Sequence, residues 1–218
     1  MTDIYICGDS ISAVYDPMMT PFTGWGQVLS LFLPGARVHD HAMAGRSTRT
    51  FIGEGRLARL HAMAPGALML IQFGHNDESD KPERCADPWT AYYDNLRIFV
   101  DFARERGARP VLLTPVCMRV FKDGILQETH GEYPAAVRAA ARDTGADLID
   151  MYRGSFEIVS AAGEEGSKAF FMHIKPGEDP RWPDGLTDNA HTRRAGALRF
   201  AEFAARELKG LVSEDTVI

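Results

Sequence analysis

The chain has 218 residues, a length typical of one domain, and we expect a single domain over residues 1–218. Apolar residues make up 45% of the chain and charged residues 25%, as in ordinary globular proteins that bury a sizeable core. The 24 Lys and Arg against 30 Asp and Glu leave a formal net charge of −6, which argues against a nucleic-acid-binding surface.

Five short segments rich in apolar residues are predicted to be strands. They are residues 3–7, 36–41, 67–73, 110–115 and 146–150. The third (ALMLIQF) and the fourth (PVLLTP) are apolar along most of their length, as expected for strands buried on both faces of a parallel sheet.

Three segments with helical spacing of apolar residues are predicted to be helices. The clearest runs from Pro88 to Gly107, with Asp87 as its N-cap. Its apolar stripe is expected to pack in the core and consists of Trp89, Tyr92, Tyr93, Leu96, Phe99, Val100 and Ala103. A second helix is predicted over Tyr133 to Thr144. The last starts near Thr192 and places on one side Ala197, Ala201, Ala204, Leu208 and Leu211.

The repeated alternation of strand and helix predicts the fold class. Five such alternations indicate an α/β protein whose parallel sheet is covered by helices on both faces. We therefore expect a three-layer α/β/α sandwich with a five-stranded parallel sheet, of the flavodoxin-like type. Ligands of such sheets bind beyond the carboxyl ends of the strands, which is where chemistry is expected.

Four polar clusters follow predicted strands or precede the last helix. They are Gly8–Ser10 after the first strand, Gly45–Ser47 after the second, Gly74–Asp77 after the third, and Asp188–His191 in a predicted loop before the last helix. Each cluster alone is also typical of a turn or a helix cap. Together, at one edge of one sheet, they predict an active site.

These residue types suit acyl transfer to water. A serine nucleophile needs a neighbouring base, a third group that orients the base, and donors for the developing oxyanion. Ser10 is the candidate nucleophile, His191 the base and Asp188 its orienting partner. The backbone N–H groups of Ser10 and Gly45 and the side-chain amide of Asn76 are the candidate oxyanion donors.

The chain resembles the SGNH hydrolases, the GDSL-type esterase superfamily. The resemblance rests on GDS at 8–10, AMAGRS at 42–47, GHND at 74–77 and the D-x-x-H run at 188–191, in the family's order. It implies the same roles for Ser10, Gly45, Asn76, Asp188 and His191, and the SGNH hydrolase fold for almost the whole chain. In the first motif Ile11 stands where the family has Leu, a change that should not affect the chemistry.

Within that superfamily the chain looks most like the rhamnogalacturonan acetylesterase branch. The resembling stretches are GRSTRTF at 45–51, QFGHNDE at 72–78, LLTPV at 112–116, HGEYPAAVR at 130–138 and PDGLTDNAHTRRAGA at 183–197. Near the base, Ala190 and Thr192–Arg193 replace the branch's usual Thr and Phe-Ser, which leaves substrate contacts there open. The branch implies removal of acetyl groups from pectic oligosaccharides without a metal or cofactor.

Galacturonate is anionic, so cationic side chains are candidate substrate contacts. The candidates are Arg46, Arg49 and Arg119, with His130 as a further polar contact. The segment from Phe170 to Leu186 is predicted to be a long irregular loop that forms a wall of the cleft, with Trp182 as a platform for a sugar ring. His75 is interpreted as structural, because it lacks a carboxylate at a useful fixed spacing.

Three alternatives remain open. The same residues would serve an esterase of acetylated xylan or of other short-chain acyl esters, because fold does not settle substrate. A non-catalytic carbohydrate-binding protein on this fold is a second alternative. A dinucleotide-binding module is a third, because Gly53–Ala58 fits G-x-G-x-x-A, although that fingerprint requires a strand just before the glycines.

The N-terminus and the cysteines bear on location. The first basic residue is Arg37 and no apolar stretch resembles a signal peptide, so we expect a cytoplasmic protein that acts on imported oligosaccharides. Cys7, Cys85 and Cys117 are odd in number and widely spaced, which predicts reduced thiols and no structural zinc. No apolar run approaches the ~20 residues that span a membrane. The sequence carries no signal for the oligomeric state.

Overall fold

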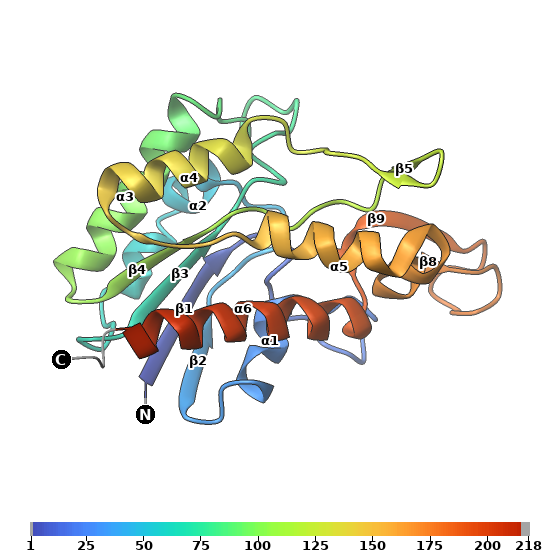
Figure 1. The fold of residues 1–218 in the computed structure, drawn as a ribbon, viewed down its shortest axis with the longest axis horizontal. Coiled ribbons are helices and arrows are strands. Elements are labelled where there is room, and N and C mark those ends of the chain that lie inside the picture. The colour runs from blue at the N-terminus through green and yellow to red at the C-terminus, as the bar shows by residue number, and fades with distance from the viewer. Residues whose placement is uncertain (1, 215–218) are drawn as a thin grey trace.

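A central sheet of five parallel strands organises the protein, as a computed structural model that describes residues 2–214 shows (Figure 1). The strands are β1 (Thr2–Gly8), β2 (Ala36–Asp40), β3 (Leu68–Gln72), β4 (Arg109–Leu113) and β7 (Asp147–Ile149), in the spatial order β2-β1-β3-β4-β7. All five predicted strands are confirmed. Each lies in parallel register with its neighbours.

Helices cover both faces of the sheet, which confirms the three-layer fold (Figure 1). One layer contains α1 (Trp25–Val28), α5 (Met151–Gly166) and α6 (Arg194–Glu214), and the other contains α2 (Thr48–Gly53), α3 (Ala91–Glu105) and α4 (Tyr133–Thr144). Short 3₁₀ turns occupy residues 29–31, 57–60 and 167–170.

Two apolar cores lie on the two faces of the sheet. Successive side chains of a strand point to opposite faces. In β3, Leu68 and Leu70 therefore pack with α1, α5 and α6, whereas Met69 and Ile71 pack with α2, α3 and α4. This two-sided burial explains the nearly continuous apolar sequence of β3.

The predicted start of α3 is wrong by three residues. The helix begins at Ala91, because the Asp87 carboxylate accepts hydrogen bonds from the backbone N–H of Trp89 and the hydroxyl of Thr90 and so closes a turn before the helix. Trp89 is 49% exposed and leaves the predicted apolar stripe, while the others of that stripe are buried or partly buried. The bounds of α4 agree with the prediction, and Gly145 ends the helix at φ 64°.

Two small hairpins complete the fold. The first consists of β5 (Phe121–Lys122) and β6 (Ile125–Leu126), and the second of β8 (Phe171–Ile174) and β9 (Leu186–Thr192). The second corrects two predictions: residues 171–174 are a strand within the predicted irregular loop, and Asp188–His191 lie in a strand rather than in a loop. The last helix begins at Arg194, because Thr192 still belongs to β9.

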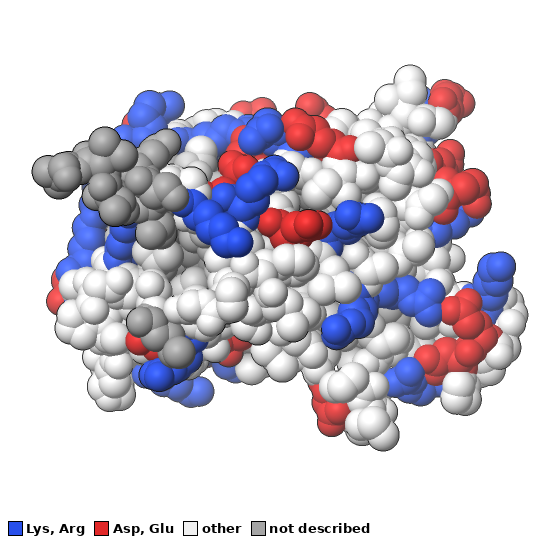
Figure 2. Space-filling view, turned by 60° about the horizontal axis from the view of Figure 1, so that its bottom comes forward, with Lys and Arg blue, Asp and Glu red and all other residues white. Residues whose placement is uncertain are grey.

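The arrangement excludes the dinucleotide fingerprint at Gly53–Ala58. Gly53 is the last residue of helix α2, so no strand precedes the glycines. Basic and acidic side chains are intermixed on the face shown in Figure 2, without a continuous basic stripe. Across the described part of the chain, no helix has the length and apolarity needed to cross a bilayer.

Candidate active site

The nucleophile candidate Ser10 lies in a tight turn directly after β1. Gly8 is required there, because a Cβ at this position would lie 2.8 Å from the carbonyl oxygen of Gln72. The Asp9 carboxylate accepts a hydrogen bond from the backbone N–H of Ile11 (2.9 Å), which closes the turn. The Tyr15 hydroxyl donates to the carbonyl of Ser10 (2.9 Å). The backbone around Ser10 is thus held from both sides.

A hydrogen-bonded chain joins Ser10, His191 and Asp188. His191 Nε2 lies 2.9 Å from Ser10 Oγ, and His191 Nδ1 lies 2.8 Å from Asp188 Oδ2. The other carboxylate oxygen of Asp188 accepts from the backbone N–H groups of Ala190 (2.8 Å) and His191 (2.9 Å). This is the geometry of a nucleophile, a base and a group that orients the base.

The carboxylate of Asp188 is strongly stabilised in its charged form. Burial would raise its pKa, but hydrogen bonds from the His191 ring and from two backbone N–H groups lower the pKa to about 2. An ionised Asp188 keeps the proton of the His191 ring on Nδ1. Nε2 is then free to accept the proton of Ser10.

The β9 strand projects His191 through an irregularity in its pairing with β8. Phe171 pairs with Thr192, whereas the next residue, Met172, pairs with Asp188. Residues 189–191 are therefore the extra residues of a bulge. A bulge turns a side chain away from its normal strand direction, and here the bulge carries the ring of His191 to Ser10.

The candidate oxyanion donors line the same pocket as Ser10. The pocket has a volume of about 280 Å³, and Ser10, Gly45, Asn76 and His191 lie in its wall. Gly45 has φ +77°, a left-handed backbone conformation that suits glycine. The Asn76 amide donates one hydrogen bond to the carbonyl of Arg46 (3.2 Å), so one N–H of its amide nitrogen remains for a substrate.

Asp77 connects the two loops that carry the candidate oxyanion donors Gly45 and Asn76. Its buried carboxylate accepts from the backbone N–H of Thr48 (2.9 Å) and from the Thr48 hydroxyl, and Thr48 follows the Gly45 loop. Burial raises the pKa of Asp77 to about 8, against the lowering effect of the Thr48 hydrogen bonds. Asp77 is therefore a supporting residue and does not touch the reacting atoms.

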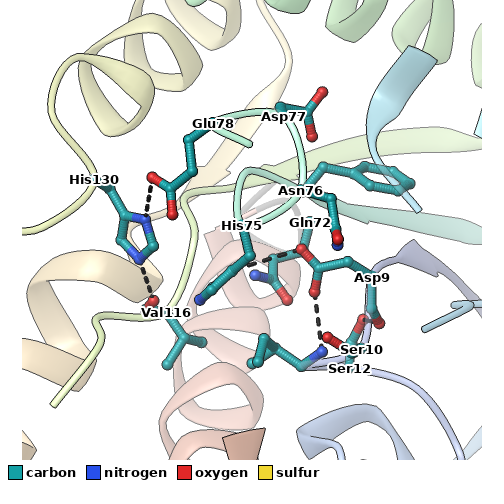
Figure 3. A network of polar contacts seen from close by, with 12 residues as sticks. Asp9, Ser10, Ser12, Gln72, His75, Asn76, Asp77, Glu78, Val116 and His130 are labelled. Carbon is teal, nitrogen blue, oxygen red and sulfur yellow. Dashed lines mark hydrogen bonds and ion pairs between the residues drawn. The ribbon is translucent and has the colours of Figure 1, made fainter. Parts of the chain in front are cut away.

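A buried network of histidines and carboxylates adjoins the pocket, and two of its members, His75 and Glu78, lie in the pocket wall (Figure 3). His75 Nδ1 lies 3.5 Å from Asp9 Oδ2, and the rings of His75 and His130 are 4.5 Å apart. Burial would lower the pKa of His75, but the Asp9 and Glu78 carboxylates raise it above its ordinary value. His75 thus links the loop that carries Asn76 to the turn that carries Ser10. The ground given for its structural interpretation is wrong, because the Asp9 carboxylate lies 3.5 Å from its ring.

Two of the predicted substrate contacts are wrong. Arg119 is only 5% exposed, and its guanidinium donates to the Ser167 hydroxyl, to Asn189 Oδ1 and to the carbonyl of Glu164. It supports the bulge of β9 from behind. His130 is 1% exposed, and its two ring nitrogens contact Glu78 (2.9 Å) and the carbonyl of Val116 (2.8 Å). Neither can reach a substrate in the pocket.

The other predicted contacts lie outside the pocket wall. Arg46 Nε pairs with Glu54 (3.1 Å), and Arg49 is exposed and donates to the carbonyl of Pro82 (3.2 Å). Trp182 is partly buried, and its ring lies 6.0 Å from that of Phe22, which stacks on His191 at 5.3 Å. This aromatic row joins the predicted sugar platform to the base.

Sequence reasoning missed Arg84 and Phe22. Arg84 lies in the pocket wall and Phe22 against the base. Both belong to irregular segments without periodicity, so no pattern distinguished them. As for metals, no group of three or more His, Cys, Asp or Glu side chains within residues 2–211 is arranged to hold an ion.

Comparisons with known proteins agree with this geometry. The sequence model of the GDSL-like Lipase/Acylhydrolase family matches residues 6–198. Two proteins of Bacillus subtilis (strain 168) are similar over 211 residues, which is 95% of this chain. Rhamnogalacturonan acetylesterase RhgT is 39% identical, with 90% of its length covered. A protein named probable rhamnogalacturonan acetylesterase YesY is 35% identical, with 93% covered.

Solved structures show the same fold. Protein YXIM of Bacillus subtilis superposes with a TM-score of 0.82 at 26% identity over 97% of this chain. The chain spans 57% of the length of that protein. A catalytic mutant of Axe2, an acetylxylan esterase from Geobacillus stearothermophilus, has a TM-score of 0.66 at 18% identity, with 95% of this chain and 94% of Axe2 covered. At that identity the likeness is one of fold alone.

Proposed function

The chain belongs to the GDSL-like lipase/acylhydrolase family and is a carboxylic ester hydrolase, and we propose that it removes O-acetyl groups from pectic (rhamnogalacturonan) oligosaccharides. The observation that carries the proposal is the continuous chain Ser10–His191–Asp188 beside two candidate oxyanion donors. The names and the 39% and 35% identities of the two Bacillus relatives support the choice of substrate.

The first half of the proposed reaction forms an acetyl-enzyme. Ser10 Oγ attacks the acetyl carbonyl carbon while His191 Nε2 takes the Ser10 proton. The carbonyl oxygen becomes an oxyanion and accepts from the N–H groups of Ser10 and Gly45 and from the Asn76 amide. The tetrahedral intermediate then collapses, the bond to the sugar oxygen breaks, and His191 returns the proton to the leaving sugar hydroxyl.

The second half releases acetate. A water molecule gives a proton to His191 and attacks the acetyl carbonyl, and the same donors stabilise the second oxyanion. Collapse breaks the bond to Ser10 Oγ, which regains its proton from His191. Asp188 holds the imidazole ring in place throughout and compensates its positive charge. Every proton is carried by His191, and no step uses a metal or a cofactor.

The proposal includes the place of action. We propose a cytoplasmic enzyme that prefers oligosaccharides to intact polymer. The three cysteines are unpaired, as is usual in a reducing compartment. Comparing acetate release from polymer with that from oligosaccharides tests the preference, and release from intact polymer alone would overturn this part of the proposal.

The test of the function is acetate release from acetylated rhamnogalacturonan oligosaccharides, with acetylated xylan and p-nitrophenyl acetate alongside. Wild type is expected to prefer the pectic substrate. Ser10→Ala is expected to lose about 10⁴-fold or more of kcat on all three. Ser160→Ala, on the exposed side of α5, is the control and should keep wild-type rates.

The outcomes separate the mechanism from the substrate. Release from p-nitrophenyl acetate or xylan alone would keep the serine esterase and discard the pectic assignment. A Ser10→Ala variant as active as wild type would overturn the mechanism. Absence of ester cleavage by folded wild type would favour a non-catalytic carbohydrate-binding protein.

A further inference from the structure

One cationic side chain in the wall of the Ser10 pocket has no carboxylate partner. Arg84 lines the pocket together with Ser10, Gly45, Asn76 and His191. Its Nη1 donates to Asn76 Oδ1 at 3.3 Å, and this is the hydrogen bond that the structure gives its side chain. Among residues 2–211, no Asp or Glu oxygen lies within 4.0 Å of its guanidinium. Glu78, the acidic residue of the same wall, is turned to His130.

The free edge of Arg84 is the one that this protein uses elsewhere to bind carboxylates. In three pairs the Nε and Nη2 atoms of an arginine contact the two oxygens of one aspartate: Arg109 with Asp147, Arg138 with Asp150, and Arg181 with Asp179. In Arg84 only Nη1 is engaged, so the Nε–Nη2 edge has no hydrogen-bond partner among the described residues. This edge matches a carboxylate with two parallel hydrogen bonds.

The position of Arg84 relates this edge to the reacting ester. A Cβ at Gly45 would lie 3.6 Å from Arg84 Nη2, within van der Waals contact, so the guanidinium lies next to this oxyanion donor. Asn76, the other donor side chain, touches Arg84 directly. A sugar whose acetyl oxygen lies at these donors therefore has the positive charge within the reach of its own ring.

Other basic residues add to the positive electrostatic field on the Arg84 side of the pocket, but they are not themselves candidates for binding the substrate carboxylate. Arg49 and Lys81 also have no carboxylate within 4.0 Å among the described residues, and Arg49 reaches Pro82, which lies two positions before Arg84. Arg46 differs, because its Nε is paired with Glu54. Arg84 is thus the unpaired cation that is also part of the pocket wall.

We propose that Arg84 is the specificity-determining residue that binds the carboxylate of a uronate ring in the substrate, through its Nε–Nη2 edge. This inference rests on the proposed function and deepens it, because it states which chemical group distinguishes the pectic substrate from a neutral acetylated sugar. A neutral substrate leaves the charge of Arg84 without a partner and gains nothing from it.

The test compares acetate release from one set of acetylated rhamnogalacturonan oligosaccharides, either with free carboxylates or with the carboxylates converted to methyl esters. For wild type, kcat/KM is expected to be about tenfold or more higher on the free acid, the size of one charge-assisted contact. Arg84→Gln is expected to bring this ratio close to one. Arg84→Lys keeps the charge without the planar fork and should give an intermediate ratio.

The readout is the ratio of kcat/KM on the free acid to kcat/KM on the methyl ester. Because Arg84 also contacts Asn76, its variants are expected to lower kcat on every ester, p-nitrophenyl acetate included. A loss common to both substrates cancels in the ratio. The matched control is Arg97→Gln on the exposed side of α3, which removes one positive charge outside the pocket wall and should keep the wild-type ratio.

Equal wild-type rates on the acid and the methyl ester would overturn the inference and leave the proposed function standing. A wild-type preference that survives in Arg84→Gln would also overturn it. Should wild type release acetate from neither pectic substrate but cleave p-nitrophenyl acetate, the proposed function itself would fail and the inference with it. The wild-type comparison needs no variant, so it holds even where a substitution at Arg84 prevents folding.

Discussion

Ser10 Oγ and His191 Nε2 lie 2.9 Å apart although 181 positions separate the two residues in the chain. Ser10 follows β1, an interior strand of the five-stranded sheet, and His191 lies in a bulge of the peripheral hairpin β8–β9. The alignment of nucleophile and base therefore depends on how this hairpin docks against the edge of the sheet. Thr192 fastens it there, because its hydroxyl donates to the carbonyl of Thr23.

Replacing Asn76 by Ala removes the side-chain donor of the oxyanion hole. We expect kcat to fall about 10²–10³-fold, with little change in KM, because this donor strengthens its bond only as negative charge develops. Steady-state kinetics on p-nitrophenyl acetate measures both. Gln127→Ala removes an amide outside the pocket wall and is the control. A change in KM alone would contradict the assigned role.

Replacing Asp188 by Asn changes the tautomer of His191. The Asn amide donates toward Nδ1, so the ring proton moves to Nε2, which can no longer accept the proton of Ser10. We expect about a 10⁴-fold loss of kcat without loss of the fold. Asp184→Asn, an exposed aspartate in the same hairpin, should keep the wild-type rate. A loss of less than tenfold in Asp188→Asn would show that His191 does not depend on this carboxylate.

Asp77 is expected to make stability depend on pH. Its pKa is raised by burial from 3.8 to about 8 in the folded protein, so the folded state keeps a proton that the unfolded chain releases above about pH 4. The free energy of unfolding should thus fall as pH rises from 4 to 8, by up to about 1.4 kcal/mol per pH unit from this group.

Asp77→Asn lacks this titration. Urea unfolding at several pH values should show that the variant gains stability relative to wild type as pH rises from 4 to 8. Because the pKa of Asp77 is raised in the folded protein, the stability difference between the variant and wild type is largest at the alkaline end of this window. Two curves that run parallel between pH 4 and 8 would contradict it.

Trp182 is expected to contribute to binding of the sugar rather than to the chemistry. For Trp182→Ala we expect KM on acetylated oligosaccharides to rise about tenfold, the size of one lost stacking contact, and kcat on p-nitrophenyl acetate to stay unchanged. Trp89→Ala replaces an exposed tryptophan outside the pocket wall as control. Equal effects on both substrates would point to a structural role through Phe22.

Much of the fold and of the candidate site could be predicted from local patterns in the amino-acid sequence. The strands β3 and β4 are buried on both faces, so their sequences are almost uniformly apolar and could be recognised. The carboxyl ends of the predicted strands also indicated which polar residues meet, because the carboxyl ends of parallel strands share one edge of the sheet. Ser10 and Asn76 were predicted from the ends of β1 and β3, and His191 from the polar run before the last helix; the structure brings the three together.

Only the tertiary structure decided what the arginines and the hairpin do. The run LTDNAHT of β9 is polar because it lies at the edge of the fold with one small partner strand, so it carries no apolar alternation. Charge in the sequence likewise does not show where a long side chain ends: Arg119 is buried behind β9, whereas Arg84 lines the pocket. The spacing of apolar residues along a strand or helix is a local property, so it can be recognised in the sequence. The partner of a guanidinium or an imidazole is set by residues far away in sequence, and only folding brings them within hydrogen-bond distance.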